Sequence, residues 1–382
     1  LLCIPLAFLS FLGVLFSEAH LSWLGLAWLC QRATRAAPPT IRDAILLGAA
    51  GGLCFLARLD SIFLVACILL WWGTRAWPSR LLIVAVAMTA AIAAPYLIAN
   101  LIYFDGFTPI SGWLKSTFPS VYLKGFLPAG FASTFAGYSI VAGIIPLGLG
   151  LILTAILRPR PSVPASILYP LAAGVLAHVA YIALFTRGHT DPYWYYVQAI
   201  FFVATAIGLF AARGRSGREA SNVAGMVILT AALVMCFVVR PRSIGETRQW
   251  VPAALGFMRE QGIDESTMIV SDCPGKLAFH TTNRIVAVDM LTANRAFFEQ
   301  MVASPNALRY LLEECTRAGK PVSHVFYLGG NTLTPVEGDS AVIYTNPRAP
   351  AEAPIGRLDR SDGLLLMRKD AGMIVWKIEP GS

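Results

Sequence analysis

Charged residues are scarce in this chain. Asp, Glu, Lys and Arg make up 14% of the 382 residues, whereas a soluble globular domain contains about 25%. Hydrophobic residues reach 56% of the chain. This shortage of charge argues against an ordinary soluble protein over most of the length and favours segments that are buried in lipid.

Sequence patterns for cofactors are also missing. Neither GxGxxG nor GxxxxGK[ST] follows a predicted strand, so nothing supports a glycine-rich nucleotide site. The seven cysteines and five histidines do not show the spacing of a zinc site. No carboxylate cluster indicates a divalent cation. We therefore expect no cofactor and assign no metal site, and a dependence on a divalent cation remains open although no residues indicate one.

What the chain has instead is a succession of apolar runs that ends near residue 239, after which the composition becomes that of a soluble protein. Several runs are shorter than the ~20 residues that cross a bilayer, so we expect short helices buried among longer ones, or a helix pair broken at mid-depth. We predict an α-helical polytopic membrane domain of eight or nine spans over residues 1–239, followed by a small α/β extracytoplasmic domain over residues 240–382. The expected spans are 1–15, 19–31, 44–57, 60–74, 80–103, 138–157, 165–186, 192–212 and 220–239.

The net charge of +8 lies entirely in the first part of the chain. Residues 1–239 hold 14 Lys and Arg against 6 Asp and Glu, and residues 240–382 hold 16 against 16. Because the excess lies in loops between apolar runs, it argues against a nucleic-acid partner. Ten arginines fall in loops on one predicted side and four basic residues on the other, so the positive-inside rule puts the first side in the cytoplasm and the C-terminal domain outside. The ten are Arg32, Arg35, Arg42, Arg75, Arg80, Arg158, Arg160, Arg213, Arg215 and Arg218, and the four are Arg58, Lys115, Lys124 and Arg187.

The chain begins Leu-Leu-Cys without a Met, and we expect helices that precede Leu1 to be missing from it. A signal peptide over residues 1–17 is the alternative, but its basic n-region and small-residue cleavage site are absent. Five of the cysteines lie in apolar runs, where packing is their expected role. Cys273 and Cys315 lie in the outer domain, where a disulfide and two free thiols both remain open.

The outer domain shows the alternation of an α/β unit. We predict helices at 248–261, 293–303 and 305–318, and a short one ending near His280. Asp272 and Asp289 follow predicted strands, at the position where open α/β sheets often bind ligands. The alternative is that both carboxylates cap turns or helices. The predicted strands are 268–270, 284–288, 322–328, 341–344, 364–367 and 373–378.

Polar groups gather in the loops on the predicted outer side. Glu18 follows the first apolar run, Arg58 and Asp60 lie between two short runs, and Lys115 closes the loop 105–115. Charged groups at a membrane boundary pair, face water or take part in function. Arg58 and Asp60 could therefore simply pair with each other.

A second outward loop, residues 187–196, combines Arg187, His189 and Asp191 with an aromatic run. The aromatic residues could form an interfacial belt. The adjacent His and Asp make a polar pocket the competing interpretation. His178 lies inside an apolar run, and we expect it to be a hydrogen-bonded packing residue more than a proton relay.

Four of these loop segments resemble segments of a known protein family. Ser-Glu-Ala-His at 17–20, Gly-Leu-Cys-Phe-Leu-Ala-Arg-Leu-Asp at 52–60, the loop 105–115 and Tyr-Trp-Tyr-Tyr at 193–196 resemble, in this order, the bacterial polytopic glycosyltransferases of the C superfamily. The similarity is greatest to arabinofuranosyl- and mannosyltransferase-like members. Leu59 replaces the proline that is usual in the family's Thr-Arg-Pro-Asp/Glu segment. Residues 272–291 resemble an outer-domain segment in which a Gly precedes a strand that ends in Asp and then Leu.

The resemblance implies transfer of a sugar from a polyprenyl-phosphate carrier to a glycan or lipid acceptor on the outer face of the inner (plasma) membrane. The leaving lipid phosphate needs a cation, and Lys115 matches the loop lysine of the family, with Arg58 and Arg187 as secondary candidates. The catalytic base of the family lies in a loop that we expect before Leu1. Glu18 and Asp60 are candidate acids that would position the acceptor, not the base. Candidate residues for binding sugar or acceptor are His189, Asp191, Trp194, Tyr195 and Tyr196.

Two other classes of protein remain open. One is a transporter, or a membrane-anchored binding protein with an outer α/β domain. The other is a cell-envelope enzyme that transfers no sugar, such as a lipid-linked ligase or a phosphotransferase. The sequence shows no internal repeat, and its ionisable residues gather at one face and not at mid-depth, which favours an enzyme over a transporter.

Overall fold

The structure is a computed structural model, and it divides the chain into two compact units. The helical unit comprises Leu1–Ile98 and Thr117–Arg240, and the α/β unit comprises Ala99–Ser116 and Pro241–Ser382. The predicted boundary at residue 239 lies outside the described residues. The structure describes residues 18–35, 38–75, 80–107, 112, 116, 118–121, 145–157, 164–185, 197–213, 243–272, 277–278, 280–287, 294–328, 333–335, 342–345, 354–358, 363–370 and 373–379.

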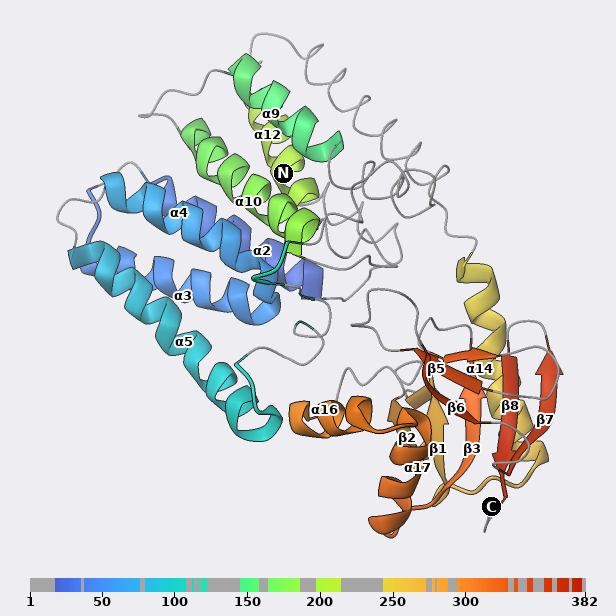
Figure 1. Cartoon of the computed structure of the whole chain (residues 1–382). Helices are drawn as coiled ribbons and strands as arrows, with labels where there is room; N and C mark the ends of the chain where they lie inside the picture. Colours follow the sequence, from blue (N-terminus) through green and yellow to red (C-terminus); the bar gives the residue numbers. More distant parts are fainter. Residues whose placement is uncertain are drawn as a thin grey trace. The chain divides into compact units, whose positions relative to one another are not determined.

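The helical unit consists of packed helices (Figure 1). Seven of the predicted spans coincide with these helices to within a few residues at most ends, and the spans 1–15 and 220–239 lie outside the described residues. The helices are α2 (Glu18–Ala33), α3 (Ile41–Ala57), the 3-10 turn η1 (Leu59–Ser61), α4 (Ile62–Arg75), α5 (Arg80–Phe104), α9 (Ile145–Leu157), the 3-10 turn η3 (Pro164–Ile167), α10 (Leu168–Phe185) and α12 (Val197–Arg213).

Within the described part of the chain, α5 alone is both long and apolar enough to cross a membrane, and α9, α10 and α12 contain shorter apolar stretches. Only 22% of the most apolar 18-residue window of α5 is buried in the protein. A core helix of a soluble protein would be mostly buried. One long helix is weak support for a membrane unit, so the polytopic arrangement stays a prediction.

The segment from α3 to α4 shows how the sequence sets the helix ends. Thr40 and Asp43 form a capping box at the start of α3, in which the Thr40 side chain accepts from the Asp43 backbone N–H (3.2 Å). The helix stops at Arg58, whose extended backbone (φ −153°, ψ 120°) cannot continue it. The chain then passes through η1 into α4, so the two short runs are separate helices.

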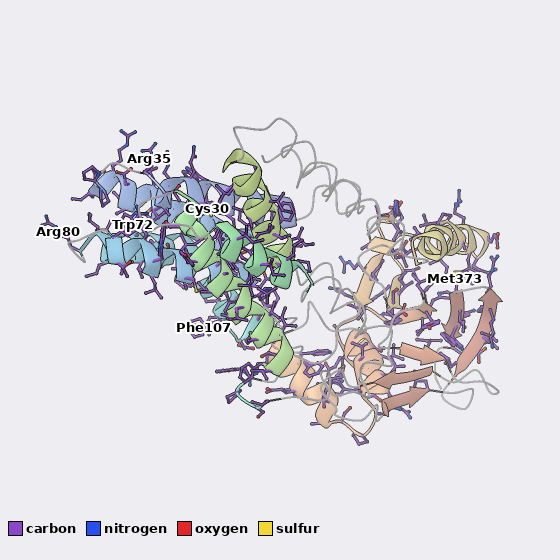
Figure 2. All side chains as sticks on the ribbon, turned by 90° about the horizontal axis from the view of Figure 1, so that it is seen from above. Cys30, Arg35, Trp72, Arg80, Phe107 and Met373 are labelled. Atoms are coloured by element: carbon purple, nitrogen blue, oxygen red, sulfur yellow. The ribbon has the colours of Figure 1, made fainter. Side chains whose placement is uncertain are left out.

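The directions of these helices put several arginines at one end of the helical unit. Since α3 ends at the turn where α4 begins, Arg42 and Arg75 lie at the opposite end of this helix pair. Arg35 joins the Arg42 end, because its Nη1 lies 3.3 Å from Oδ1 of Asp43. In Figure 2 the labelled Arg35 and Arg80 lie toward the same end of the helical unit. The arginine-rich loops between residues 32 and 80 therefore share one end.

Glycines allow close contacts between helices. Gly48 and Gly52 lie four residues apart on α3, and a Cβ atom at Gly48 would lie 2.3 Å from the carbonyl oxygen of Ala85 in α5. The Thr89 hydroxyl donates to the Gly48 carbonyl oxygen across the same contact (3.0 Å). A Cβ at Gly174 in α10 would lie 2.7 Å from Cα of Leu64 in α4. Small residues with interhelical hydrogen bonds are typical of helices that pack within lipid.

The α/β unit contains a mixed five-stranded sheet with strand order β2-β1-β3-β8-β7. Strands β2, β1 and β3 are parallel, whereas β8 and β7 are antiparallel to their neighbours. A second sheet, β4-β5-β6, is antiparallel. The elements are α14 (Ser243–Glu260), β1 (Met268–Ser271), β2 (Arg284–Ala287), α16 (Arg295–Ala303), α17 (Ala307–Arg317), β3 (Val322–Tyr327), β4 (Leu333–Pro335), β5 (Val342–Thr345), β6 (Pro354–Leu358), β7 (Leu364–Asp370) and β8 (Met373–Ile378).

Alternate residues of the five-stranded sheet enter two different cores, as the period of two in a strand requires. Val270 and Val325 pack with Phe298 of α16 and other residues of α16 and α17 on one face. Ile269 and Phe326 pack with α14 on the other. The unit is therefore a helix–sheet–helix arrangement, in which Asn294 and Asn306 cap the starts of α16 and α17.

The predicted elements of this unit correspond to α14, α16, α17 and strands β1, β2, β3, β5, β7 and β8, with shifted ends. Strands β4 and β6 were not predicted, and neither was the grouping of residues 99–116 with this unit. Cys315 carries a free, partly buried thiol, so the disulfide considered with Cys273 is not formed in the structure. Cys273 lies outside the described residues.

Candidate functional site

Buried polar side chains gather at the turn between α3 and α4 in the helical unit. The guanidinium of Arg58 donates twice to the Asp60 carboxylate, from Nε to Oδ1 (3.0 Å) and from Nη2 to Oδ2 (2.6 Å). The Arg58 side chain is 5% exposed and that of Asp60 is 23% exposed. Two parallel bonds fix the carboxylate in orientation as well as position, and the remaining exposure leaves it open to a ligand.

A third residue reaches the same carboxylate from a distant part of the sequence. Gln198, in the first turn of α12, donates from Nε2 to Oδ1 of Asp60 (2.8 Å). Its side chain is fully buried, and its Oε1 has no hydrogen-bond partner among the described residues. A buried acceptor without a donor costs free energy, about 1–3 kcal/mol. Such an oxygen is a candidate acceptor for a donor group of a ligand.

His178 of α10 completes the group. Its Nε2 lies 3.6 Å from Oδ2 of Asp60, which is beyond hydrogen-bond distance. The ring is buried and stacks on Phe63 of α4, with ring centroids 5.5 Å apart. His178 therefore faces the carboxylate without bonding to it. We refer to Arg58, Asp60, His178 and Gln198 as the Asp60 cluster.

Two further contacts hold the helix ends around the Asp60 cluster. The hydroxyl groups of Ser22 and Ser61 are hydrogen-bonded at 2.8 Å, and Trp23 Nε1 donates to the carbonyl oxygen of Val197 (3.1 Å). The first contact joins α2 to the turn between α3 and α4, and the second joins α2 to the first turn of α12. The cluster thus lies at one end of the helical unit, the end opposite Arg35 and Arg42.

Aromatic rings extend from the cluster toward an exposed residue. Phe63 lies 5.4 Å from Tyr181, Tyr181 lies 5.9 Å from Phe185, and Phe185 lies 5.3 Å from Phe118, all measured between ring centroids. Phe118 is 65% exposed. His178, Tyr181 and Phe185 share one face of α10, since they follow the i, i+3, i+7 spacing of a helix. We call Phe63, Tyr181, Phe185 and Phe118 the aromatic row.

The structure brings only part of the predicted site together. Arg58 and Asp60 form the pair that the sequence allowed. Glu18 is the first residue of α2, and its side chain is outside the described residues. The remaining candidates also lie outside the described residues: Lys115, Arg187, His189, Asp191, Trp194, Tyr195 and Tyr196.

Sequence reasoning missed Gln198 and undervalued His178. Both are polar residues inside runs that are otherwise apolar, and that contrast was the available signal. It was not decisive, because nothing in the sequence shows that residues separated by 138 positions converge on one carboxylate. His178 was expected to be hydrogen-bonded, and its Nε2 lies 3.6 Å from Oδ2 of Asp60, beyond hydrogen-bond distance.

In the α/β unit, Asp272 follows β1, and its Oδ1 accepts a hydrogen bond from the backbone N–H of Leu328 after β3 (2.7 Å). The carboxylate therefore joins the ends of two parallel strands, which supports the structural interpretation of this residue. Asp289 lies outside the described residues. Among the residues that the structure describes, no group of three or more His, Cys, Asp or Glu could hold a metal ion.

No protein-family model matches this sequence, and no curated protein matches it. The functional assignment therefore depends on the Asp60 cluster, on the surface of the helical unit and on the resemblance of the loop segments.

Proposed function

We propose that this protein is an integral membrane glycosyltransferase. It moves a sugar from a polyprenyl-phosphate carrier to a cell-envelope glycan or lipid acceptor, on the outer face of the inner (plasma) membrane. The α/β unit is extracytoplasmic and contributes to binding the acceptor. The alternation of sides and the arginine excess of the loops support this orientation.

The surface of the helical unit supports a lipid environment. Large apolar side chains point outward, such as Leu70 at 63% exposed and Ile83 at 66% exposed. The polar residues Ser22, Ser61 and Gln198 are buried instead. In water, proteins with such an apolar surface tend to associate, whereas lipid solvates the surface. Glycine contacts between α3 and α5 fit the same environment.

The observation that carries the enzymatic proposal is the fixed, partly exposed carboxylate of Asp60. An acceptor hydroxyl that donates to this carboxylate would be held in a defined orientation, and orientation of the reactants is a large part of catalysis. Arg58 neutralises the carboxylate and holds it in place. Direct contact between Arg58 and the lipid phosphate stays a prediction and would require this pair to open.

Lys115 and Arg187 remain the proposed cations for the lipid phosphate, with Lys115 first, because a leaving phosphate in a low-dielectric site needs a positive group. His189, Asp191 and the aromatic residues 194–196 remain proposed contacts of sugar or acceptor. Glu18 remains a second proposed acceptor-positioning acid. These roles rest on the resemblance and on the sidedness of the loops.

The test uses membranes that contain the full-length protein and a radiolabelled polyprenyl-phosphate sugar. We expect label to enter a glycan or lipid product, and we expect Lys115→Ala to abolish transfer without loss of membrane insertion. Asp60→Asn should lower transfer by about 10²-fold, since it removes the charged acceptor of the hydroxyl hydrogen bond. Glu313→Gln, at an exposed carboxylate of α17, is the charge-matched control. Wild-type turnover by both Lys115→Ala and Asp60→Asn would refute the proposal.

One observation favours the transporter as a second candidate. An ion pair and a histidine buried between helices are typical of substrate or proton pathways. The same membranes, sealed as vesicles, separate the two functions. Product labelling without accumulation inside the vesicles supports the transferase, whereas accumulation of unmodified sugar inside the vesicles supports the transporter.

A further inference from the structure

We infer that the Asp60 cluster and the adjoining end of the aromatic row form a saccharide subsite, in which His178 and Gln198 bind hydroxyl groups beside Asp60. The inference deepens the proposed transferase function and rests on it for the role of the bound sugar. It identifies two residues that the resemblance does not assign, and it names the chemical class of the ligand.

The first argument is the gap between Asp60 and His178. The 3.6 Å between Oδ2 of Asp60 and Nε2 of His178 is too long for a direct hydrogen bond, but one oxygen that lies beside the two atoms can be about 2.8 Å from each. Only a group that donates to the carboxylate and accepts from the imidazole N–H satisfies both atoms. A hydroxyl group does so, because it has one donor and two acceptor positions.

The second argument is the unused acceptor of Gln198. Its Nε2 is committed to Oδ1 of Asp60 at 2.8 Å, which fixes the orientation of the amide and leaves Oε1 buried without a partner among the described residues. Among the residues that the structure describes, Oε1 therefore lacks a donor next to the carboxylate. Two hydroxyl groups on adjacent carbons of one ring supply a donor for Oε1 as well as the group between Asp60 and His178.

The third argument is the aromatic surface next to these polar atoms. Phe63 stacks on His178 and lies 5.4 Å from Tyr181, and both aromatic side chains are partly exposed. A sugar ring has an apolar face of C–H groups and an edge of hydroxyls. Aromatic rings beside convergent polar groups match both parts of such a ligand.

While the Arg58–Asp60 pair stays closed, its charges disfavour anionic and cationic ligands. An anion such as a phosphate would meet the Asp60 carboxylate, and a metal cation would meet the Arg58 guanidinium, whose Nη2 already lies 2.6 Å from Oδ2. An isoprenoid chain alone would cover the aromatic rings, but it would leave Oε1 of Gln198 without a donor. A neutral polyhydroxylated ring satisfies all of these atoms.

Binding can be measured without turnover. The full chain in lipid nanodiscs is mixed with methyl α-D-mannopyranoside or methyl α-D-arabinofuranoside, and saturation-transfer NMR reports contact with the sugar protons. His178→Phe keeps an aromatic ring stacked on Phe63 but removes Nε2. Tyr181→Leu removes one aromatic side chain of the subsite. We expect each variant to weaken binding of the sugar that wild type binds better by about tenfold, because His178→Phe removes one hydrogen bond to the sugar and Tyr181→Leu removes an aromatic contact with its apolar face. Tyr96→Leu, at an exposed tyrosine of α5 outside the aromatic row, should bind as wild type does.

The thermal midpoint of each variant in nanodiscs shows whether it has folded. If folded His178→Phe and Tyr181→Leu bind both sugars as wild type does, the subsite is refuted, and so it is if wild type binds neither sugar. Both results leave the proposed transfer reaction testable with labelled donor. Conversely, wild-type binding that both variants lose, without any transfer activity in full-length membranes, would support the subsite and refute the transferase.

Discussion

The Arg58–Asp60 pair allows a quantitative prediction about stability. Removing one partner of a buried ion pair costs about 3–5 kcal/mol, because the other charge is left in a low-dielectric place. Arg58 is 5% exposed, so Asp60→Asn should cost about 3 kcal/mol. Asp60 is 23% exposed, so its carboxylate regains water more easily when Arg58 is lost, and Arg58→Met should cost only about 1.5 kcal/mol.

The double variant measures the interaction energy between Arg58 and Asp60, apart from the effect of each residue alone. Because Arg58→Met with Asp60→Asn leaves no unpaired charge, its destabilisation should fall short of the sum of the single variants by at least about 2 kcal/mol. The assay is denaturant unfolding of the full chain in mixed micelles, with helix content measured by circular dichroism. Arg309 and Glu313 on α17 are the control pair, 3.3 Å apart and both 54% exposed, and their coupling should be about 0.3–0.5 kcal/mol. A coupling of that small size at Arg58 and Asp60 would refute the description of a buried, mutually dependent pair.

Three other predictions follow from separate parts of the chain. Gly48→Val should destabilise the helical unit by about 1–3 kcal/mol in the same unfolding assay, because its Cβ would lie 2.3 Å from the Ala85 carbonyl oxygen. Burial, and secondarily Lys377, lowers the pKa of His324 below its ordinary 6.5, so the unfolded chain takes up this proton at a higher pH than the folded one. Stability is then full above about pH 6.5 and falls as the pH drops toward the folded pKa, and His324→Phe should reduce this slope in urea titrations. Burial raises the pKa of the Cys315 thiol, so a thiol reagent should label it faster in urea than in buffer at pH 7.5, and equal rates would contradict the burial.

The positions of helices and strands were predictable because they depend on local patterns. The apolar runs that became α3 and α4 are separated by Arg-Leu-Asp, and the structure ends and restarts the helix there. The alternation of Val322–Tyr327 similarly predicted β3. Strands β4 (Leu-Thr-Pro) and β6 (Pro-Ile-Gly-Arg-Leu) were not predicted, because Pro and Gly are depleted in strands and weaken the pattern.

The candidate site was predictable only where its residues are close in sequence. Arg58 and Asp60 are two positions apart, and their pairing could be considered from charge alone. Gln198 and His178 reach the same carboxylate from α12 and α10, and this depends on how helices pack, which the period of apolar residues does not specify. The glycine contact of Gly48 with Ala85 shows the same limit, because the identity of the helix that faces a small residue is a tertiary property.

The composition of the Asp60 cluster is itself an argument for function. Apolar side chains of similar volume often replace a buried ion pair without loss of stability, and they would suit a helix bundle surrounded by lipid still better. The chain instead keeps a guanidinium, a carboxylate and an amide together, with one amide oxygen lacking a donor among the described residues. Packing alone does not explain this arrangement, because each of these polar groups costs free energy to bury. A ligand that supplies the missing donor explains both the cost and the partial exposure of Asp60, and this is why we place the chemistry of the protein at this end of the helical unit.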